Sequence, residues 1–441
     1  MSATTSLLTD QYELTMLDAA LRDGTASRPC IFEVFARRLS GGRRFGVIAG
    51  TGRLVSLLRD FHFDDDDLRF LRDKRIVSAA TIQHLESYRF TGTITGYREG
   101  ELYFPGSPVL TVEGSFGDAV ILETLALSVL NHDSAVATAA SRMANAAGGR
   151  PLAEMGSRRA GERSAIAAAR AAYIAGFGAT SNLEAGRTWG IPTMGTAAHA
   201  WTLLHESEED AFRAQIAALG EGTTLLVDTY DIPTGVENAI RAGGTSLGGV
   251  RIDSGDLPIV AAEVRRQLDG LGATSTRITV TSDLDEYAIA ALAASPVDAY
   301  GVGTSLVTGS GYPTAGMVYK VVARADAAGG WVAVAKKAEG KISHGGRKRA
   351  FRMVDGGVAT EERIEVADGF EQLPDAASVG GARPLQDTFI EQGDIDTAHE
   401  GPSGVVAARE HHLRVREEMP VHALALSRSD PAIPTTFVDV A

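Results

Sequence analysis

The chain is short of the residues that stabilise disulfide-rich or zinc-bound folds, because its 441 residues include only one cysteine, Cys30. A single cysteine excludes an intramolecular disulfide framework and any zinc site built from several cysteines, and it is typical of a reducing compartment. Aromatic residues make up only 6%, but 44% of all residues are hydrophobic, as in ordinary folded proteins. We therefore expect a globular chain of two or three domains, or one large barrel with additions.

The sequence also lacks a long hydrophobic run. Its most apolar stretch, AVILETLALSVL at 119–130, contains Glu123 and is shorter than the roughly 20 residues that cross a bilayer. We predict a buried helix there and no membrane partner. The first residues lack a basic segment followed by an apolar one, so we predict no secretory signal and expect a cytoplasmic location.

Positive charge is scarce: 42 Lys and Arg face 56 Asp and Glu, for a net charge of -14. This balance argues against a nucleic-acid partner, which would need many phosphate-neutralising side chains. It does not exclude anionic substrates, because the local field of a cleft can oppose the net charge. One dense basic cluster is either a solvated hairpin face or an attractor of phosphates, and it consists of Lys336, Lys337, Lys341, Arg347, Lys348 and Arg349.

A G-x-G-x-x-G motif is missing after the first strand-like run of the middle part, so a dinucleotide-binding Rossmann sheet is not predicted. Instead, apolar runs alternate with Ala-rich helical stretches between about 119 and 325. The runs are RPLAEM, GFGAT, IPTMG, TTLLVD, LGGVRID, TRITVTS and VDAYGVG. This alternation predicts an α/β fold with a parallel sheet, as an irregular or incomplete (β/α) barrel.

The two ends of the chain read differently from the middle. Residues 1–118 and 326–441 mix short strand-like and helical pieces, and we predict that they pack together as one α+β domain beside a catalytic domain at 119–325. Within the first segment, FDDDDLRFLRDK at 63–74 predicts a helix opened by acidic residues, whose side chains cap its exposed N–H groups.

Function in a barrel of this kind lies in the loops that follow the carboxyl ends of the strands. These loops hold arginine, histidine, aspartate and glycine, a mixture that suits a phosphorylated ligand with hydroxyls and bound Mg²⁺. The candidates are Gly156–Arg159, Thr196–His199, Thr229–Asp231, Arg251, Asp253–Asp256, Ser282, Asp283, Thr304 and Ser305.

Several of these residues also have a structural interpretation. Asp283 precedes Glu286 at helix-capping spacing, so it either caps a helix or contacts a ligand. Asp256 stands before Leu257-Pro258 and fits a helix cap better than a catalytic role. Asp253 lies at the strand end before that cap position, which favours function.

Two further features stay open in the same way. His199 is either a buried structural histidine or a functional one, and its place in a glycine-led loop after a strand favours function. The glycine-rich stretch 300–311 is either a plain loop or a turn whose backbone N–H groups bind an anion.

Long motifs in the chain resemble those of nicotinate phosphoribosyltransferases, particularly of the actinobacterial type. They are LLTDQYELTM, HDSAVATAASRM, EMGSRRAGERSA, ATSNLEAGRTWGIPTMGTAAHAW, LVDTYD, GVRIDSGDL, TSDLD, YGVGTSLVTGSG and VAKKAEGKIS, and they span nearly the whole sequence. The resemblance implies a barrel of the type II phosphoribosyltransferase kind, a domain built from both chain ends, and a homodimer. It also implies transfer of phosphoribosyl from 5-phosphoribosyl 1-pyrophosphate to nicotinate, giving nicotinate mononucleotide in NAD salvage, with ATP as co-substrate and Mg²⁺ on the substrate phosphates.

The resemblance also implies roles for particular residues. His199 matches the histidine that ATP phosphorylates, Asp253 the contact to the ribose hydroxyls, and Arg158 the contact to pyrophosphate. The nicotinate contacts implied are Tyr12, Thr196, Met155, Ser181 and Asn182, and the phosphoribosyl contacts are Arg251, Thr304, Gly303, Ser282 and Asp283.

Two positions bear on the choice of substrate. Met155 stands where most relatives have a phenylalanine that stacks on the pyridine, so stacking on that side is weaker. Ser181 and Asn182 are neutral where the nicotinamide-using relative has an acid, which favours a carboxylate substrate. The alternatives are the same chemistry on nicotinamide or quinolinate, or a non-catalytic barrel that binds phosphoribosyl ligands. The four-cysteine knuckle of some archaeal members is missing, so no zinc is expected.

Overall fold

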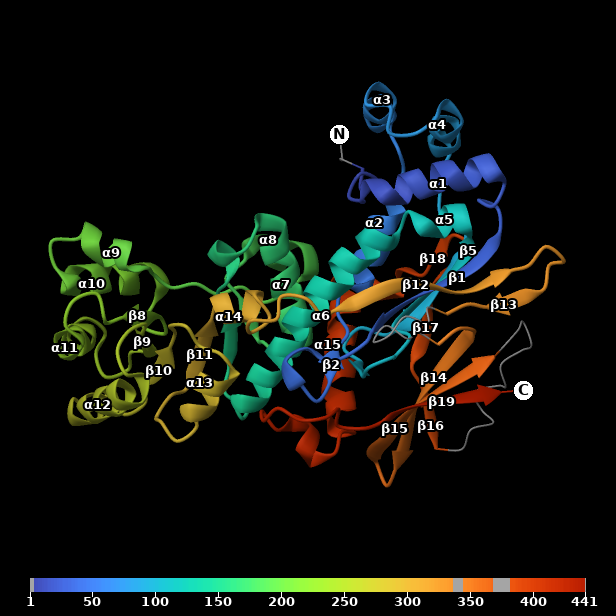
Figure 1. Ribbon diagram of the computed structural model, residues 1–441. Helices are drawn as coiled ribbons and strands as arrows, with labels where there is room; N and C mark the ends of the chain where they lie inside the picture. Colours follow the sequence, from blue (N-terminus) through green and yellow to red (C-terminus); the bar gives the residue numbers. More distant parts are fainter. Residues whose placement is uncertain (1–3, 336–343, 368–380, 441) are drawn as a thin grey trace. The chain divides into compact units, whose positions relative to one another are not determined.

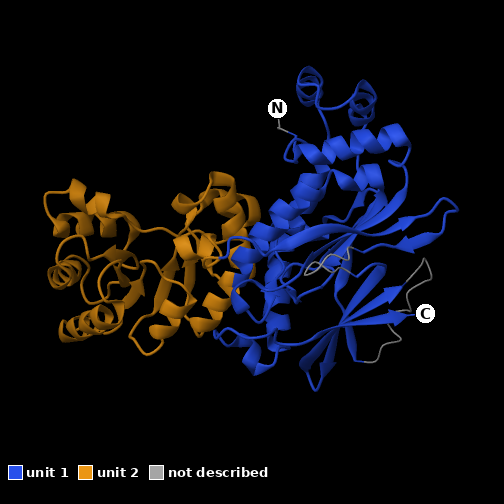
Figure 2. Ribbon diagram, viewed as in Figure 1, with its two compact units in different colours: residues 1–138, 312–441 blue, residues 139–311 orange. Residues whose placement is uncertain are grey.

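The computed structural model describes residues 4–335, 344–367 and 381–440 (Figure 1). The chain divides into two compact units, of which unit 1 combines residues 1–138 with 312–441 and unit 2 is residues 139–311 (Figure 2). Along the sequence, the units change at residues 138/139 and 311/312. The domain boundaries at 118 and 325 stay predictions.

Unit 1 contains a large antiparallel sheet that runs in the order β13-β12-β1-β5-β3-β17-β18 (Figure 1). Both chain ends contribute to it, because β1 pairs with β5 on one side and with β12 on the other. The strands are β1 (Pro29–Ala36), β3 (Thr93–Tyr97), β5 (Leu110–Ser115), β12 (Met317–Ala325), β13 (Trp331–Ala333), β17 (Gln386–Glu391) and β18 (Asp394–Ile395).

A second sheet of unit 1 comes from the C-terminal segment, in the order β16-β14-β15-β19. Its strands are β14 (Arg347–Asp355), β15 (Val358–Ala367), β16 (Ala382–Pro384) and β19 (Thr435–Val440), while β2 (Gly46–Val47) pairs separately with β4 (Leu102–Tyr103). The helices are α1 (Gln11–Asp23), α2 (Thr51–Arg59), α3 (Asp65–Asp73), α4 (Ala79–Glu86), α5 (Phe116–Val120), α15 (Gly401–Glu417) and the long α6 (Glu123–Ala146), which runs past residue 138.

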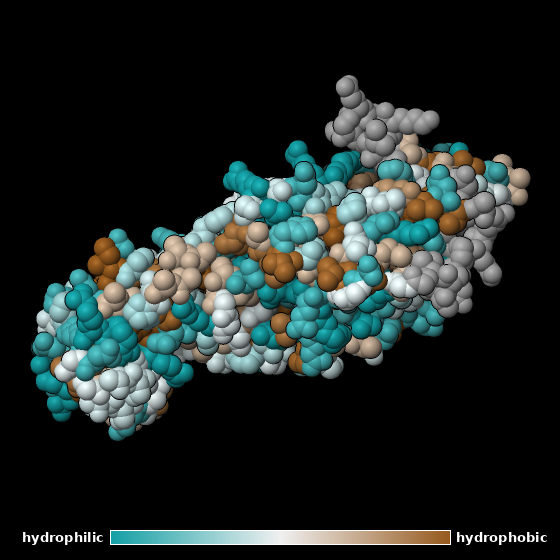
Figure 3. Space-filling model, turned by 90° about the horizontal axis from the view of Figure 1, so that it is seen from below, coloured by the Kyte–Doolittle hydropathy of each residue, from teal (hydrophilic) through white to brown (hydrophobic). Residues whose placement is uncertain are grey.

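Local sequence signals explain two of these helices. Asp64 accepts the N–H groups of Asp66 and Asp67, and Asp67 bonds back to the N–H of Asp64, so α3 begins with the predicted acidic cap. The apolar stretch at 119–130 lies mostly in α6, as predicted. No helix among the described residues combines the length and the apolar character that a membrane span needs. Hydrophilic residues predominate on the face in Figure 3, and hydrophobic ones gather there only in small groups.

The basic cluster is not a solvated face where the structure describes it. Lys348 lies on β14 with a side chain only 2% exposed, and it donates to Glu33 at 2.8 Å. Arg347, on the same strand, forms an ion pair with Glu113 at 2.8 Å. The solvated-face interpretation is therefore wrong for Lys348, because β14 packs its charge against the carboxylate of β1. Lys336, Lys337 and Lys341 lie outside the described residues.

Unit 2 has a parallel sheet in the order β7-β6-β11-β10-β9-β8, with helices α10, α11 and α12 flanking β8, β9 and β10 (Figure 1). The strands are β6 (Leu152–Glu154), β7 (Ala179–Thr180), β8 (Thr224–Leu226), β9 (Gly249–Ile252), β10 (Arg277–Val280) and β11 (Ala299–Val302). Between and after them lie α7 (Glu162–Ile174), α8 (Leu183–Trp189), α9 (His199–Leu204), α10 (Glu208–Leu219), α11 (Ile232–Gly243), α12 (Leu257–Gly270), α13 (Glu286–Ala291) and α14 (Thr304–Val307). This half-barrel confirms the prediction of an incomplete (β/α) barrel.

One predicted strand does not form. The run IPTMG makes only an isolated bridge between Thr193 and Thr180, followed by the N–H of Met194 donating to the carbonyl of Thr180. Pro192 has no N–H to give to a ladder, so the segment cannot continue as a regular strand.

Candidate active site

The carboxyl ends of all the strands in unit 2 meet at one edge, because these strands are parallel. The sheet order therefore decides which loops are neighbours. Along this edge, in sheet order, follow Ser181 and Asn182 after β7, Met155–Arg158 after β6, Gly303 and Thr304 after β11, Ser282 and Asp283 after β10, Asp253 after β9, and Asp228 after β8. The predicted site residues of unit 2 thus belong to a single edge of the sheet.

His199 begins α9 and lies beside three polar residues. Its Nδ1 lies 3.1 Å from the hydroxyl of Thr229, and its Nε2 lies 4.0 Å from carboxylate oxygens of both Asp228 and Asp253. The imidazole is 41% exposed, so it is not a buried structural histidine. One ring edge is fixed by a hydroxyl, and the ring still reaches solvent, which suits a residue that reacts with a ligand.

Asp228 is a functional candidate that sequence reasoning missed, because it is the last residue of the strand-like run TTLLVD. Its side chain is 1% exposed, and its Oδ2 accepts the N–H of Asp253 at 2.8 Å and the hydroxyl of Ser254 at 2.7 Å. Its other oxygen, Oδ1, is buried without a hydrogen-bond partner among the described residues. Asp228 therefore holds the loop after β9 in place, and its Oδ1 stays available as a buried acceptor for a ligand. An acidic residue directly after a buried strand was the signal available in the sequence.

Asp253 points one oxygen into the sheet and leaves the carboxylate partly open. Its Oδ1 accepts the hydroxyl of Thr281 at 2.5 Å, and the side chain is 32% exposed. Thr281 directly follows β10, so this contact joins the loops after two neighbouring strands. A carboxylate that is fixed at one oxygen and accessible at the other can accept hydrogen bonds from the hydroxyls of a ligand.

Arg251 supplies the positive charge of the same edge. Its Nη1 donates to the hydroxyl of Thr196 at 3.2 Å, while its buried Nε has no hydrogen-bond partner in the described part of the chain. Burial lowers the pKa of Arg251, the carboxylates of Asp253 and Asp228 partly offset this, and the like charge of Arg158 lowers it further. Two guanidinium groups that repel each other in this way favour an anion between them.

The loop after β10 is strained. Ser282 and Asp283 have φ angles of 93° and 28°, a region that residues other than glycine seldom adopt. Asp283 does not cap the following helix, because Asp285 accepts the N–H groups of Tyr287 and Ala288 at the start of α13. The capping interpretation of Asp283 is therefore wrong, and the strain marks this loop as one shaped for a purpose other than helix capping.

The expected cap at Asp256 is also only partly present. Asp256 occupies the N-cap position of α12, but its side chain makes no capping hydrogen bond. The glycine-rich turn has a structural part as well, since the hydroxyl of Ser310 donates to Glu286 at 2.6 Å. Gly303, at its start, remains at the edge of the sheet.

At the β6 and β7 end of the sheet, a buried carboxyl connects the loop after β6 with the end of β7. Glu154 ends β6 with no exposed surface, and it accepts the hydroxyl of Thr180 at 2.5 Å and the N–H of Gly156. Burial raises the pKa of Glu154, and these two hydrogen bonds offset the rise only in part. The carboxyl therefore ties the loop after β6 to the end of β7.

The loops after β6 and β7 are linked a second time through Asn182. Its N–H donates to the hydroxyl of Thr180 at 2.9 Å, and its side-chain amide donates to Ser157 at 3.0 Å. Met155 packs over Gly301 of β11, where a Cβ would lie 2.7 Å from the methionine sulfur. A side chain at position 301 would collide with Met155 where it now lies. The glycine therefore allows Met155 to take this position.

Tyr12, a predicted nicotinate contact, and Cys30, the single cysteine, both lie in unit 1. Tyr12 is on α1 and 46% exposed, and burial of part of the ring together with Glu123 and Glu13 raises its pKa to about 12. Its role as a nicotinate contact stays a prediction. Cys30 is buried in β1, and burial raises the pKa of its thiol to about 11, so it is not a reactive thiolate.

Comparisons with known proteins agree on one family. Residues 7–131 match the model of the nicotinate phosphoribosyltransferase N-terminal domain. The chain is 54% identical to nicotinate phosphoribosyltransferase pncB1 of Mycobacterium tuberculosis, over 98% of this chain and 95% of that one. It is 36% identical to the nicotinate phosphoribosyltransferase of Bacillus subtilis, over 87% and 80% of the two chains.

The fold gives the same result. The crystal structure of human nicotinic acid phosphoribosyltransferase superposes with a TM-score of 0.80 at 26% identity, over 97% of each chain. A fold shared over the whole length, together with identity above one half to a full-length relative, is not limited to one motif or one domain. The chain belongs to the nicotinate phosphoribosyltransferase family, the enzymes of NAD biosynthesis that its motifs predicted.

Proposed function

We propose that this enzyme transfers the phosphoribosyl group of 5-phosphoribosyl 1-pyrophosphate to nicotinate, and that ATP drives the step through a phosphorylated His199. The observation that carries the proposal is the arrangement of His199, Asp228, Asp253 and Arg251 at one edge of the parallel sheet. Acids, a histidine and a guanidinium at such an edge suit a ligand with hydroxyls and phosphates.

The transfer breaks the bond between the anomeric carbon of the ribose and the pyrophosphate oxygen, and forms a bond from that carbon to the pyridine nitrogen. The pyridine lone pair is the nucleophile, so no serine or cysteine attacker is required. Negative charge grows on the leaving pyrophosphate, next to which we place Arg158 and Arg251. Because that charge is largest in the transition state, their positive charge stabilises the transition state more than the ground state.

Asp253 is assigned to the ribose hydroxyls. Its free oxygen accepts their hydrogen bonds, and the developing positive charge on the ribose is favoured by a carboxylate nearby. Gly303, Thr304, Ser282 and Asp283 lie after the two neighbouring strands and are assigned to the 5′-phosphate. The backbone N–H groups of these loops are donors of the kind that phosphates accept.

Magnesium fits the acidic side of this site. Among the described residues no group of three histidines, cysteines or acids could hold a metal by itself. Mg²⁺ usually takes only one or two carboxylates and completes its shell with phosphate oxygens and water. The buried, unpaired Oδ1 of Asp228 and the open oxygen of Asp253 would serve as such ligands, and the ion would screen the charge of the substrate phosphates.

The nicotinate end is assigned to the loops after β6 and β7. Met155 offers a sulfur face to the pyridine, and Ser181 and Asn182 leave the site without an acid that would repel the substrate carboxylate. Thr196, already bonded to Arg251, completes the contacts proposed in unit 2. The assignment of Tyr12 to nicotinate rests on the motif that contains it. These neutral surroundings favour nicotinate over nicotinamide.

The coupling assigned to His199 has two steps. A ring nitrogen attacks the γ-phosphorus of ATP, so that a nitrogen–phosphorus bond forms, the β,γ-bridging bond breaks and ADP leaves. Water later cleaves the phosphohistidine to phosphate and restores the ring. While it lasts, the phosphoryl group adds about two negative charges beside Asp228 and Asp253. Such a change can alter the surrounding loops and their affinity for substrate.

One assay tests the proposal. Nicotinate, nicotinamide and quinolinate are offered separately with 5-phosphoribosyl 1-pyrophosphate, with and without ATP, and mononucleotide and pyrophosphate are measured. Product from nicotinate alone, increased by ATP, is the expected result. Product from nicotinamide or quinolinate instead would overturn the substrate assignment, and no product from any of them would indicate a barrel that only binds phosphoribosyl ligands.

A further inference from the structure

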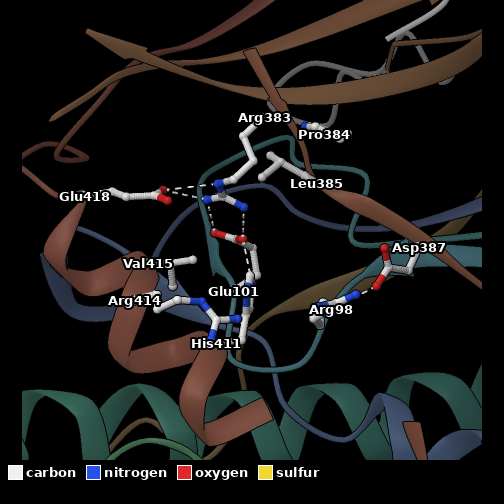
Figure 4. Close-up of a pocket in the computed structure, with 10 residues that line it drawn as sticks. All are labelled: Arg98, Glu101, Arg383, Pro384, Leu385, Asp387, His411, Arg414, Val415 and Glu418. Carbon is white, nitrogen blue, oxygen red and sulfur yellow. Dashed lines mark hydrogen bonds and ion pairs between the residues drawn. The ribbon is translucent and has the colours of Figure 1, made fainter. Parts of the chain in front are cut away.

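A pocket in unit 1 is lined by residues from distant parts of the chain. It measures about 280 Å³ and lies among the end of β3, the start of β4, β16, β17 and α15 (Figure 4). Its polar lining is Arg98, Glu101, Arg383, Asp387, His411, Arg414 and Glu418, and Pro384, Leu385 and Val415 supply apolar surface. None of these residues has a part in the proposed phosphoribosyl transfer.

The buried carboxylate of the pocket has no capacity left for a ligand. The side chain of Glu101 is 1% exposed, and one oxygen accepts from Arg383 at 2.6 Å and from His411 at 2.9 Å. The other oxygen accepts the N–H of Leu102 at 3.0 Å. Burial alone would raise the pKa of Glu101, but the hydrogen bond from His411 and the charges of Arg352 and Arg383 hold it well below its usual range. Glu101 is therefore a fixed anion that orients Arg383 and His411.

Two other arginines of the pocket keep most of their donors. Within the described part of the chain, Arg98 uses only its Nε, which donates to Asp387 at 2.8 Å, so its other four N–H groups have no partner there. Arg414 has no hydrogen bond or ion pair among the described residues. Figure 4 shows these two side chains on opposite sides of Glu101. The acceptors that remain in the pocket are one oxygen of Asp387 and one oxygen of Glu418. The pocket therefore has many more free donors than free acceptors.

The ligand that matches this excess is a phosphate. Two guanidinium groups with free forks are best satisfied by an acceptor with several oxygens and about two negative charges, which a phosphate group has and a carboxylate lacks. The ion pair between Arg98 and Asp387 is partly exposed and contributes little to stability, so an incoming anion can compete with it at little cost. The volume lies just below the range of about 300–1,000 Å³ of common ligand pockets, so the ligand is small.

We propose that this pocket is a second ligand site of the enzyme, which binds a phosphate group, free or carried on a small sugar, through the free N–H groups of Arg98 and Arg414. The apolar surface of Leu385 and Val415 offers a seat for the carbon atoms of a phosphate ester. The proposal does not depend on the reaction assigned to unit 2.

The test measures binding of inorganic phosphate and of ribose 5-phosphate by calorimetry. The starting protein carries Arg251→Ala, which weakens phosphate binding at the edge of the unit 2 sheet and leaves the pocket intact. We expect binding in this background, and at least a tenfold loss of affinity when Arg98→Ala and Arg414→Ala are added. Tighter binding of ribose 5-phosphate than of phosphate would identify the ester as the ligand class, and equal binding would identify the free ion.

Arg22→Ala combined with Arg69→Ala is the matched control, because both are exposed helix arginines of the same unit and their loss removes two positive charges, as the pocket variant does. Both pocket arginines are substantially exposed, so the variants should fold, which the thermal midpoint checks. No binding in the Arg251→Ala background, or equal losses in the pocket and control variants, would overturn the proposal.

Discussion

Asp228 accepts the backbone N–H of Asp253 at 2.8 Å, so a buried acid of one strand end positions the exposed acid of the next. The same oxygen of Asp228 accepts the hydroxyl of Ser254, and its other oxygen has no hydrogen-bond partner in the described ranges. Asp228 is therefore the residue on which the geometry of the acidic side of the site depends. Its effect on the reaction is exerted through Asp253 and His199.

Asp228→Asn should preserve the shape of the site and remove one charge. The amide oxygen can still accept the N–H of Asp253, but the attraction to His199 and to any bound cation is lost. A lost charge-assisted contact of about 1–3 kcal/mol corresponds to roughly a five- to hundredfold fall in kcat, with a smaller change in KM for nicotinate. Asp231→Asn is the control, since Asp231 is exposed and only caps α11. An equal loss in both variants would contradict this role.

His199→Ala should abolish the ATP hydrolysis that is coupled to transfer. Slow formation of nicotinate mononucleotide, independent of ATP, should remain. Loss of the imidazole removes the proposed phosphoryl acceptor, whereas Arg251 and Asp253 remain. The measurement is ATP hydrolysis per mononucleotide formed, together with labelling of the protein by γ-labelled ATP. His205→Ala provides the comparison, because His205 caps the end of the same helix and its ring hydrogen-bonds to the carbonyl of Trp201 and not to a site residue among those described. Unchanged ATP hydrolysis in His199→Ala would refute the assignment.

Glu154→Gln should weaken nicotinate binding more than catalysis. A buried carboxyl with a raised pKa is replaced by a neutral group of the same shape, and the bonds to Thr180 and Gly156 must be rearranged. We expect KM for nicotinate to rise about fivefold, with kcat changed less, since one hydrogen bond contributes about 1 kcal/mol. Glu162→Gln, at the exposed start of α7, should change neither constant. A fall in kcat alone would argue against a role in holding the loops after β6 and β7.

Glu33→Gln should destabilise unit 1 strongly. It leaves the ammonium group of Lys348 buried without its partner, a change that costs about 3–5 kcal/mol. Combining Glu33→Met with Lys348→Met should recover much of the loss, because no buried charge remains. Thermal midpoints check this, with Glu86→Gln as the control at an exposed pair whose atoms lie 4.0 Å apart. A midpoint for Glu33→Gln as high as that of the control would show that Lys348 is not buried in solution.

His412 should make the protein less stable in mild acid. Burial lowers the pKa of His412 to about 4, the hydrogen bond to the carbonyl of Gly100 opposes the shift, and the charge of Arg416 adds to it. Between pH 6.5 and 4 the unfolded chain therefore binds one more proton at this residue than the folded chain. The contribution of a neutral His412 to the free energy of unfolding is complete above pH 6.5. It falls as the pH drops towards 4, by about 2 kcal/mol at pH 5.

His412→Gln tests this dependence. The variant should be less stable at pH 7.5, because a buried ring is replaced, but it should lose less stability than the parent chain between pH 7.5 and pH 5. Thermal or urea unfolding at the two pH values measures the difference. Leu413→Ala, at an exposed position of the same helix α15, removes no titratable group and should leave the pH dependence unchanged. Parallel pH profiles for parent and His412→Gln would contradict the buried, neutral histidine.

Much of the fold followed from the sequence because its signals are local. The alternation of apolar runs with Ala-rich helices predicted parallel strands, and the acidic run before α3 predicted its cap. The strand expected at IPTMG failed for a reason that is also local, since Pro192 has no donor for a ladder. Spacing alone was not enough for Asp283, because Asp285 competes for the same helix end and its side chain has the better position.

The sequence by itself determined which residue types follow each strand, and in which order along the chain. The tertiary structure alone decided which of these loops are neighbours, because hydrogen bonding between strands orders the sheet as β7-β6-β11-β10-β9-β8. That order places Asp228 against the loop of Asp253 and ties Glu154 to Thr180, although 25 and 26 residues separate these partners. It also took the three-dimensional packing of β14 on β1 to bury Lys348 beside Glu33, since a charged residue has no local signal for burial.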